Sequence, residues 1–283
     1  MHTLYNTLLL GLMKSQTGIA EKEYTQKDID TVWSDAWQTE IEVGKVDLFG
    51  HHLFKAGYPV YKSYLPKTDF TLLEIGSGSG RYGMAIARDF PNSHVFLTDP
   101  TASSVEVIKI AQKKLLLSNI TIEVADATNL QYDDESFDVI FADAVIQHII
   151  DVKTAIQELH RVLKPGGVMI LSAVNSINPP HATYKKIKKI RGQEYEYGYE
   201  RTYKPAELRK LFFQAGLDDV SVDGFSIAYG LLRLKKHKKI YGRLGTYLHR
   251  VVTLVDSVTN RWLTKRYGFM LFAIGTKPPT KTN

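Results

Sequence analysis

The chain has 283 residues, 44% of them hydrophobic, and a net charge of +6 at pH 7. This length suits one large α/β domain with additions, or two small domains, and the composition excludes a chain whose main state is disorder. The absence of cysteine excludes a disulfide scaffold, an iron–sulfur cluster and a thiol nucleophile.

Residues 1–69 are predicted to form a mainly helical lead-in. The apolar run near its start lacks the basic flank and cleavage site of a secretory signal, and no stretch reaches the ~18 apolar residues of a membrane-spanning helix, so we expect a cytoplasmic protein. Thr25 and Asp28 are spaced so that their side chains satisfy the free amides at the start of a helix. A second helix is expected over residues 54–61, where Pro59 marks its start or a kink.

Residues 70–176 alternate short apolar runs with helical patterns, which is typical of βαβ units and a parallel sheet. The strands are expected at residues 70–75, 95–98, 120–124, 137–141 and 168–174. The helices between them are expected at residues 81–90, 103–117 and 152–163.

Residues 177–203 interrupt this pattern. They are rich in Lys and Tyr, and we interpret Asn178-Pro179-Pro180 at their start as part of a loop. After this insertion the alternation resumes, with a helix over residues 204–215 and strands at residues 220–222 and 269–274.

The most informative motif is Glu74-Ile75-Gly76-Ser77-Gly78-Ser79-Gly80, which follows the first expected strand. Glycines allow a tight strand-to-helix turn and a close approach of the backbone to a ligand. About 20 residues later the second strand ends at Asp99, whose carboxylate suits the ribose hydroxyls of a nucleoside. Alone, this pattern also fits a dinucleotide site, because Gly78, Gly80 and Gly83 match the dinucleotide fingerprint.

Acidic residues near the glycine loop favour a cationic cofactor. Glu74 stands two residues before the first glycine, where its charge would repel a pyrophosphate and attract an amino group and a sulfonium. Asp126, beside Ala127, follows the third strand, and Asp143 follows the fourth. The carboxyl ends of parallel strands meet at one edge of a sheet, so we expect these acids to lie at the mouth of a common site.

Together with Arg161-Val162-Leu163-Lys164-Pro165-Gly166-Gly167, these motifs occur in the order and at the spacings of class I S-adenosylmethionine-dependent methyltransferases. The chain resembles these enzymes, and among them the type 11 group of small-molecule methyltransferases, most clearly over residues 70–176. The resemblance implies an α/β fold with a Rossmann-like, doubly wound sheet of seven strands. Most of the strands would be parallel and the last antiparallel, with helices on both faces.

The same resemblance implies how the chain is divided. Residues 70–283 would form one methyltransferase domain with insertions at 177–203 and 225–266. Residues 1–69 would precede it and cover the cofactor. Trp33 and Trp37 in this lead-in are then either ordinary core residues or part of that cover.

The resemblance also implies S-adenosylmethionine as the cofactor. The glycine loop would pass close to its methionine part, and Glu74 would hold the amino group. Asp99 would bind the ribose hydroxyls, Asp126 with Ala127 would contact adenine, and Asp143 would line the methyl-transfer face. The cofactor-binding residues expected are Glu74, Gly76, Ser77, Gly78, Gly80, Asp99, Asp126, Ala127 and Asp143; no metal ligand is expected.

Methyl transfer is a displacement at a sulfonium in which the protein mainly supplies proximity and orientation. A base is needed only where the acceptor must lose a proton. His148, which follows the fourth strand, is the candidate catalytic base, and a structural role is the alternative. His181 and Tyr184 in the insertion are weaker candidates.

The acceptor is expected to be a small molecule, with lipids and glycans among the alternatives. Residues 231–266 hold ten Lys or Arg against one acid and carry +9, so the rest of the chain sums to −3. Apolar residues recur at helical spacing in this segment, which predicts a basic amphipathic helix. It would pack on the core or make peripheral contact with the inner face of a membrane. The helix stripe consists of Leu244, Leu248, Val251, Val255, Val258 and Trp262.

Other functions compete with this hypothesis. Nucleic-acid binding is disfavoured, because Glu194, Glu196 and Glu200 interleave with the basic and aromatic residues of the insertion. An NAD(P)-dependent oxidoreductase or epimerase would use the same glycine turn, but Glu74 opposes it. A non-catalytic module that keeps a cofactor site is the third alternative. The oligomeric state is left open.

Overall fold

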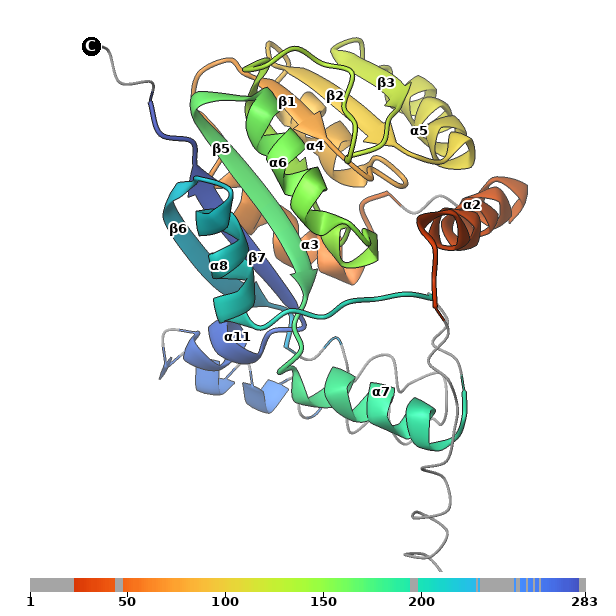
Figure 1. Ribbon diagram of the computed structural model, residues 1–283, viewed down its shortest axis with the longest axis vertical. Helices are drawn as coiled ribbons and strands as arrows, with labels where there is room; N and C mark the ends of the chain where they lie inside the picture. The colour runs from red at the N-terminus through yellow and green to blue at the C-terminus, as the bar shows by residue number, and fades with distance from the viewer. Residues whose placement is uncertain are drawn as a thin grey trace, which may run out of the picture.

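The structure is a computed structural model that describes residues 23–43, 48–193, 198–227 and 261–279, with residues 229, 247, 250–252, 254–256, 258 and 259. Its centre is a seven-stranded sheet of order β3-β2-β1-β4-β5-β7-β6 (Figure 1). Of these strands only β7 runs antiparallel to its neighbours, which confirms the predicted Rossmann-like sheet. The strands are β1 Thr71–Glu74, β2 His94–Asp99, β3 Ile120–Val124, β4 Phe137–Ala142, β5 Leu163–Val174, β6 Asp218–Phe225 and β7 Met270–Thr276.

Helices cover both faces of the sheet, which explains why its central strands are continuous apolar runs. In β1 the adjacent residues Leu72 and Leu73 are both fully buried, one in each of two separate cores. The first core includes α3 His52–Lys62, α4 Arg81–Asp89 and α5 Ala102–Leu115. The second includes α6 Val152–Val162 and α8 Pro205–Gln214.

The strand order reverses at β1, which pairs with β2 on one side and β4 on the other. The carboxyl ends of these strands therefore part and leave room for a ligand. Two backbone bonds hold the glycine loop at this place: Ile75 N donates to the Phe141 carbonyl at 3.1 Å, and Ser77 N donates to the Thr98 carbonyl at 2.9 Å.

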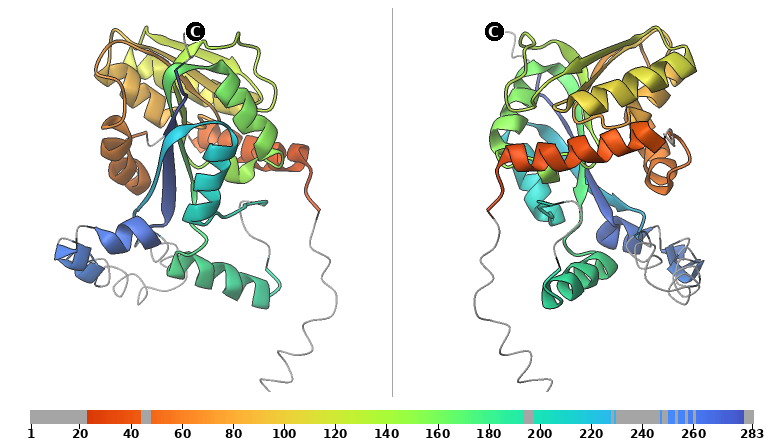
Figure 2. Two further views of the ribbon diagram at one scale, coloured as in Figure 1. Left: turned by 60° about the vertical axis from the view of Figure 1, so that its left-hand side comes forward. Right: turned by 90° about the vertical axis from the view of Figure 1, so that its right-hand side faces the viewer.

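The lead-in contributes the helix α2 Gln26–Val43, which contacts α5 (Figure 2, right). Thr25 and Asp28 cap its start as predicted: Thr25 N donates to Asp28 Oδ2 at 2.8 Å, and Asp28 N donates to Thr25 Oγ1 at 3.3 Å. Pro59 lies inside α3.

The start of the 177–203 insertion differs from the expected loop, because residues 179–190 form the helix α7 Pro179–Ile190. Asn178 Oδ1 accepts the His181 amide at 2.9 Å, and the prolines occupy first-turn positions where the amide is not needed. Asn178 Nδ2 also donates to the Tyr267 carbonyl at 2.8 Å, which fixes the start of α7 against the segment before β7.

The predicted amphipathic helix of residues 231–266 is described only in its C-terminal part, which includes α11 Trp262–Tyr267. Leu244 and Leu248 lie outside the described residues. Val258 is 80% exposed and Trp262 55%, so these two members of the apolar stripe face solvent rather than the core. Within the described part of the chain, no helix combines the length and apolarity needed to cross a bilayer.

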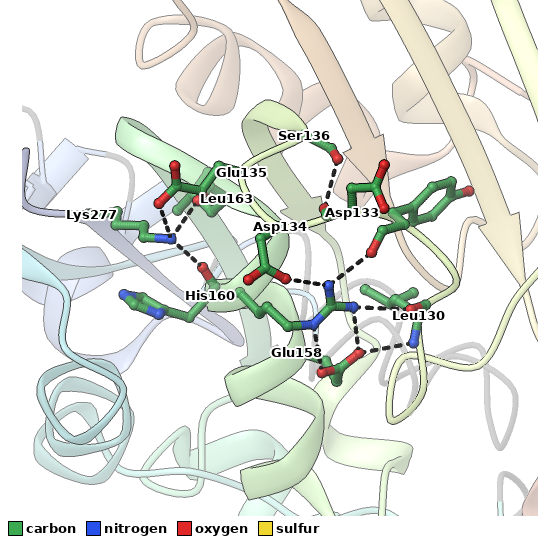
Figure 3. A network of polar contacts seen from close by, with 11 residues as sticks. Leu130, Asp133, Asp134, Glu135, Ser136, Glu158, His160, Leu163 and Lys277 are labelled. Atoms are coloured by element: carbon green, nitrogen blue, oxygen red, sulfur yellow. Dashed lines mark hydrogen bonds and ion pairs between the residues drawn. The ribbon is translucent and has the colours of Figure 1, made fainter. Parts of the chain in front are cut away.

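A network of polar contacts ties the end of α6 to the loop before β4, and Figure 3 labels Leu130, Glu158 and Lys277 in it. Arg161, near the end of α6, donates several of these bonds. Its guanidinium forms a fork with Glu158, at 2.9 Å to each carboxylate oxygen. It also donates to the carbonyls of Tyr132 at 2.8 Å and Leu130 at 3.0 Å. Lys277, beyond β7, adds bonds to two carbonyls near the start of β5. The motif that begins at Arg161 therefore has a structural role far from the glycine loop.

Candidate active site

A cavity of about 390 Å³ opens at the carboxyl ends of β1, β2 and β4. Its lining combines the glycine loop and acidic side chains with a set of apolar side chains. The polar part of the lining includes Glu74, Gly76, Ser77, Gly78, Asp99 and Asp143. The apolar part includes Leu53, Phe54, Val174, Phe269 and Met270, and the lining also contains His51, Gln147, His148 and Glu200.

The glycine loop is tightly enclosed by its neighbours. Gly76 and Gly78 have φ values of 56° and 57°, which L side chains rarely adopt. A Cβ on Gly76 would lie 2.5 Å from Val145, and a Cβ on Gly78 would lie 2.5 Å from Trp37. The loop thus needs glycine both for its backbone conformation and for the close approach of its surroundings.

Asp99 is buried and fixed by three bonds. Its Oδ2 accepts the Gly78 amide at 3.0 Å, and its Oδ1 accepts the Thr101 amide at 3.0 Å and the Thr101 hydroxyl at 2.8 Å. Oδ2, which accepts one of these bonds, has further lone-pair capacity for a ligand in the cavity that Asp99 lines. This is the rigid acceptor that a pair of vicinal hydroxyls requires.

Glu74 ends β1 at the same place and is also buried. Its Oε2 accepts the Gly83 amide at 2.7 Å, which ties the strand to the first turn of α4. Burial raises the pKa of Glu74 to about 8, and the Gly83 amide and Arg81 only partly offset this effect. A cation bound beside this carboxyl would favour its ionised form.

Asp143 is half-buried, and sequence reasoning missed its partners. Tyr61 from α3 and Ser172 from β5 both donate to its Oδ1 at 2.7 Å. Burial raises the pKa of Asp143, and these bonds oppose the rise. The expected helix over residues 54–61 included Tyr61 but could not reveal the contact of its hydroxyl.

His148 belongs to a short helical turn, η1 Ile146–His148, and lines the cavity as predicted. Its Nδ1 lies 2.8 Å from the Tyr199 carbonyl, which can only accept, so the proton is on Nδ1. Its Nε2 lies 3.3 Å from the Gln147 side-chain amide. Gln147 Oε1 accepts the Val174 amide at 2.8 Å, so its NH₂ group faces His148.

The helix α2 closes the cavity from outside. Trp33 and Trp37 are half-buried and line it, rather than filling the main core. The Trp33 ring meets the His148 ring edge-on, with centroids 5.0 Å apart. Gln26 Nε2 donates to the His148 carbonyl at 3.3 Å. Sequence reasoning left the position of this helix open, because its amphipathic pattern names no partner.

Three expected cofactor residues do not line the cavity: Gly80, Asp126 and Ala127. Gly80 instead caps α4 with φ 70°. Asp126 is exposed, and its Oδ1 accepts the amide and the hydroxyl of Thr128, each at 2.8 Å. Asp126 lies near enough to Asp30 of the cavity wall to contribute to the raised pKa of Asp30. The contact of Asp126 and Ala127 with adenine stays a prediction.

The polar part of the lining fits S-adenosylmethionine. The glycine loop offers a cradle that any Cβ would fill. Three carboxyl groups, from Glu74, Asp99 and Asp143, line the cavity with it and suit a ligand with an ammonium and a sulfonium. A pyrophosphate would gain no such partner from them.

Comparisons with known proteins also indicate a methyltransferase. The sequence profile of a methyltransferase domain matches residues 66–216. Demethylmenaquinone methyltransferase from Staphylococcus epidermidis is 26% identical over 225 residues, which cover 74% of this chain and 92% of that protein.

Two solved structures share the fold. One is a methyltransferase from Thermotoga maritima described as a possible histamine N-methyltransferase, with a TM-score of 0.59, 20% identity, and coverage of 87% of this chain and 99% of that one. The other is phosphoethanolamine N-methyltransferase 2 from Haemonchus contortus, with a TM-score of 0.59, 20% identity, and coverage of 92% and 61%. Since the matched profile spans more than half of the chain, this protein belongs to the methyltransferase domain family and is an S-adenosylmethionine-dependent methyltransferase.

Proposed function

We propose that this enzyme methylates a lipid-like aromatic acceptor, of the kind on which demethylmenaquinone methyltransferases act. The observation that carries the proposal is the mixed lining of the cavity. Beside the loop and acids expected at the cofactor, apolar side chains such as Phe54, Phe269 and Met270 line it and would contact a ring or an alkyl chain. The name of the S. epidermidis relative supports the same acceptor class.

The residues of this chain would act mainly by placement. S-adenosylmethionine, when bound, supplies a methyl group on a positively charged sulfur. Asp99 and the glycine loop would fix the position of the nucleoside, and Glu74 would hold the amino group. The α2 tryptophans would exclude water from the cavity, which strengthens the electrostatic contacts inside. Proximity and orientation then account for most of the acceleration.

We also propose His148 as the base that receives the acceptor proton. The Tyr199 carbonyl accepts the Nδ1 proton, so Nε2, which lies 3.3 Å from the Gln147 side-chain amide, is the ring nitrogen that would receive a proton. The alternative is that His148 only orients Gln147 and the adjoining loop.

A third part of the proposal is peripheral contact with an anionic membrane through residues 231–266. The support is two exposed apolar side chains on the described part of this segment: Leu254 is 70% exposed and Val258 80%. Basic residues Arg261, Lys265 and Arg266 follow it. A lipid-like acceptor would be reached from such a surface.

The acceptor is tested with a panel of three compounds: a demethylmenaquinol, histamine and phosphoethanolamine. We expect the purified enzyme with S-adenosylmethionine to form methylated product from the quinol alone, as detected by mass spectrometry. Asp99→Ala should abolish turnover by weakening cofactor binding, about 100-fold for the loss of charge-assisted bonds. Turnover of histamine or phosphoethanolamine without the quinol would overturn the proposed acceptor class.

A further inference from the structure

We infer that Tyr61 is a positioning residue for S-adenosylmethionine, because its hydroxyl holds Asp143 in the wall of the cavity while Tyr61 itself lies outside that wall. Tyr61 belongs to α3, in the lead-in, and Asp143 directly follows β4. The Tyr61 hydroxyl donates to Asp143 Oδ1 at 2.7 Å. The inference extends the prediction that Asp143 contacts the cofactor, and it does not depend on the proposed acceptor.

The Tyr61 ring is fixed in the core of the molecule. Its side chain is 1% exposed. Four aromatic rings surround it at centroid distances of 5.2 to 5.9 Å, those of Tyr82, Phe141, Phe225 and Phe272. A Cβ on Gly57, one turn earlier in α3, would lie 3.1 Å from the same ring. A ring packed in this way cannot move its hydroxyl away from Asp143 without displacing core side chains.

Ser172 of β5 is the second donor to Asp143, and it extends the contact to the loop after β4. Its Oγ donates to Asp143 Oδ1 at 2.7 Å and accepts the Ala144 amide at 2.9 Å. Ala144 has a φ of 59°, which a residue with a Cβ rarely adopts. The next side chain, Val145, lies 2.5 Å from the place of a Cβ on Gly76. The bonds of Tyr61 and Ser172 therefore fix the chain where it passes the glycine loop.

The two hydroxyls also act on the charge of Asp143. Burial raises the pKa of this carboxyl group, and the bonds from Ser172 and Tyr61 oppose the rise. The ionisable groups that interact with Asp143 come from three elements: Tyr61 of α3, Glu74 of β1, and Arg81 and Tyr82 of α4. Without the Tyr61 hydroxyl, the ionised form would lose a donor and the pKa of Asp143 would rise further. A protonated Asp143 would no longer attract the ammonium and the sulfonium of the cofactor.

The test compares Tyr61→Phe with Tyr58→Phe by calorimetric titration of the full-length protein with S-adenosylmethionine. Tyr58, one turn earlier in α3, is the matched control, because its hydroxyl lies 2.8 Å from Asp89 Oδ2 and neither residue lines the cavity. Tyr61→Phe should weaken cofactor binding about 10-fold at pH 8, the loss of one hydrogen bond to a charged group, and more at pH 6. Tyr58→Phe should keep the wild-type affinity at both pH values, although both variants should unfold at a lower urea concentration.

Ser172→Ala is the second variant, because it removes the other donor and should weaken cofactor binding with the same dependence on pH. Asp143→Asn should weaken binding at least as much as Tyr61→Phe does. Glu106→Gln, at an exposed carboxyl group of α5, should leave cofactor affinity unchanged. Because Tyr61 acts through Asp143, the losses in Tyr61→Phe and Asp143→Asn should be less than additive when the two are combined.

The outcomes separate the inference from the predictions around it. Wild-type affinity in Tyr61→Phe, or losses that add fully with those of Asp143→Asn, would overturn the role of Tyr61. Wild-type affinity in Asp143→Asn would overturn the cofactor role of Asp143 and this inference with it. Neither result bears on the proposed acceptor, which is identified by the methylated product. In turnover, the KM of Tyr61→Phe for S-adenosylmethionine should rise more than its kcat falls.

Discussion

At the scale of single residues, the site is shaped by where charge is buried. Glu74, Asp99 and Asp143 converge on one cavity, and each is held by donors from a different part of the chain. Such convergence costs desolvation energy in the free protein, which a cationic ligand offsets. The three carboxyl groups therefore favour a cationic ligand and indicate where it would bind.

Glu74 should couple cofactor binding to proton release. Its ordinary pKa of 4.5 is raised to about 8, so at pH 7 the free protein holds it mostly protonated. An ammonium and a sulfonium nearby would lower this pKa, and about one proton should leave on binding. Calorimetric titration at pH 7 in two buffers of different ionisation enthalpy measures this number.

The matched variants decide whether Glu74 is the source of that proton. Glu74→Gln should abolish the release, whereas Glu106→Gln should not change it. The raised pKa also makes the stability of the free protein depend on pH. Because the pKa of Glu74 is higher in the folded protein than in the unfolded chain, the wild-type protein should lose stability as the pH rises from 4.5 to 8. Glu74→Gln should not show this loss. Release that persists in Glu74→Gln would place the titrating group elsewhere.

Replacing His148 should lower kcat. If its Nε2 takes the acceptor proton, His148→Gln should reduce kcat by about 10²-fold or more while cofactor affinity stays unchanged. The pH profile of kcat would then lose its acidic limb. A reduction in kcat with that limb preserved would assign His148 the orienting role instead.

At the scale of elements, α2 and the glycine loop form one unit. The Trp37 side chain occupies the space that a Cβ on Gly78 would need, so the helix lies as near to the loop as glycine allows. The loop is therefore closed from outside by a segment that precedes the sheet in sequence (Figure 2).

Gly78→Ala and Gly166→Ala separate backbone strain from this steric contact. Both glycines have positive φ, 57° and 77°, but among the described residues no atom lies within 4 Å of a Cβ on Gly166. Each substitution should cost about 1–2 kcal/mol of stability for its backbone conformation. Only Gly78→Ala should also weaken S-adenosylmethionine binding, and adding Trp37→Ala should restore part of the loss. Equal cofactor affinity in both variants would contradict the close contact of α2.

At the scale of the whole molecule, the two ends of the sheet have different tasks. The carboxyl ends of the strands carry the cavity. The Arg161 network lies near the other ends of β4 and β5, where it joins α6 to the loop before β4. We expect Arg161→Lys to lower the free energy of unfolding by about 1–3 kcal/mol, since an ammonium cannot replace the fork that serves Glu158 and two carbonyls. Urea unfolding measures the change. The control is Arg88→Lys, because Arg88 forms a surface ion pair with Asp89, and this substitution should cost under about 0.5 kcal/mol. Cofactor affinity should be equal in both variants.

The membrane proposal also belongs to this scale. The described helices of the 231–266 segment and the basic helix α7 lie at the same end of the molecule (Figures 1 and 2). We expect the protein to sediment with phosphatidylglycerol vesicles and not with phosphatidylcholine vesicles, and to be released by salt. Leu254→Ser with Val258→Ser should weaken this binding about tenfold or more, because two exposed apolar side chains are lost. The control is Leu116→Ser, at an exposed position at the end of α5, and it should have no effect on vesicle binding. Equal binding to both kinds of vesicle would contradict the proposal.

The sequence alone predicted the sheet and the glycine loop at its carboxyl edge. Both are local: apolar runs form strands, and positive φ restricts the loop to glycine. Tertiary structure decided the rest. The Tyr61–Asp143 bond, the Trp37 cover and the Glu200–His181 pair join residues distant in sequence. No periodicity encodes which side chains meet, because such contacts depend on how helices lie across the sheet. The sequence also could not reveal that Val258 is exposed, because that depends on which side chains fill the core.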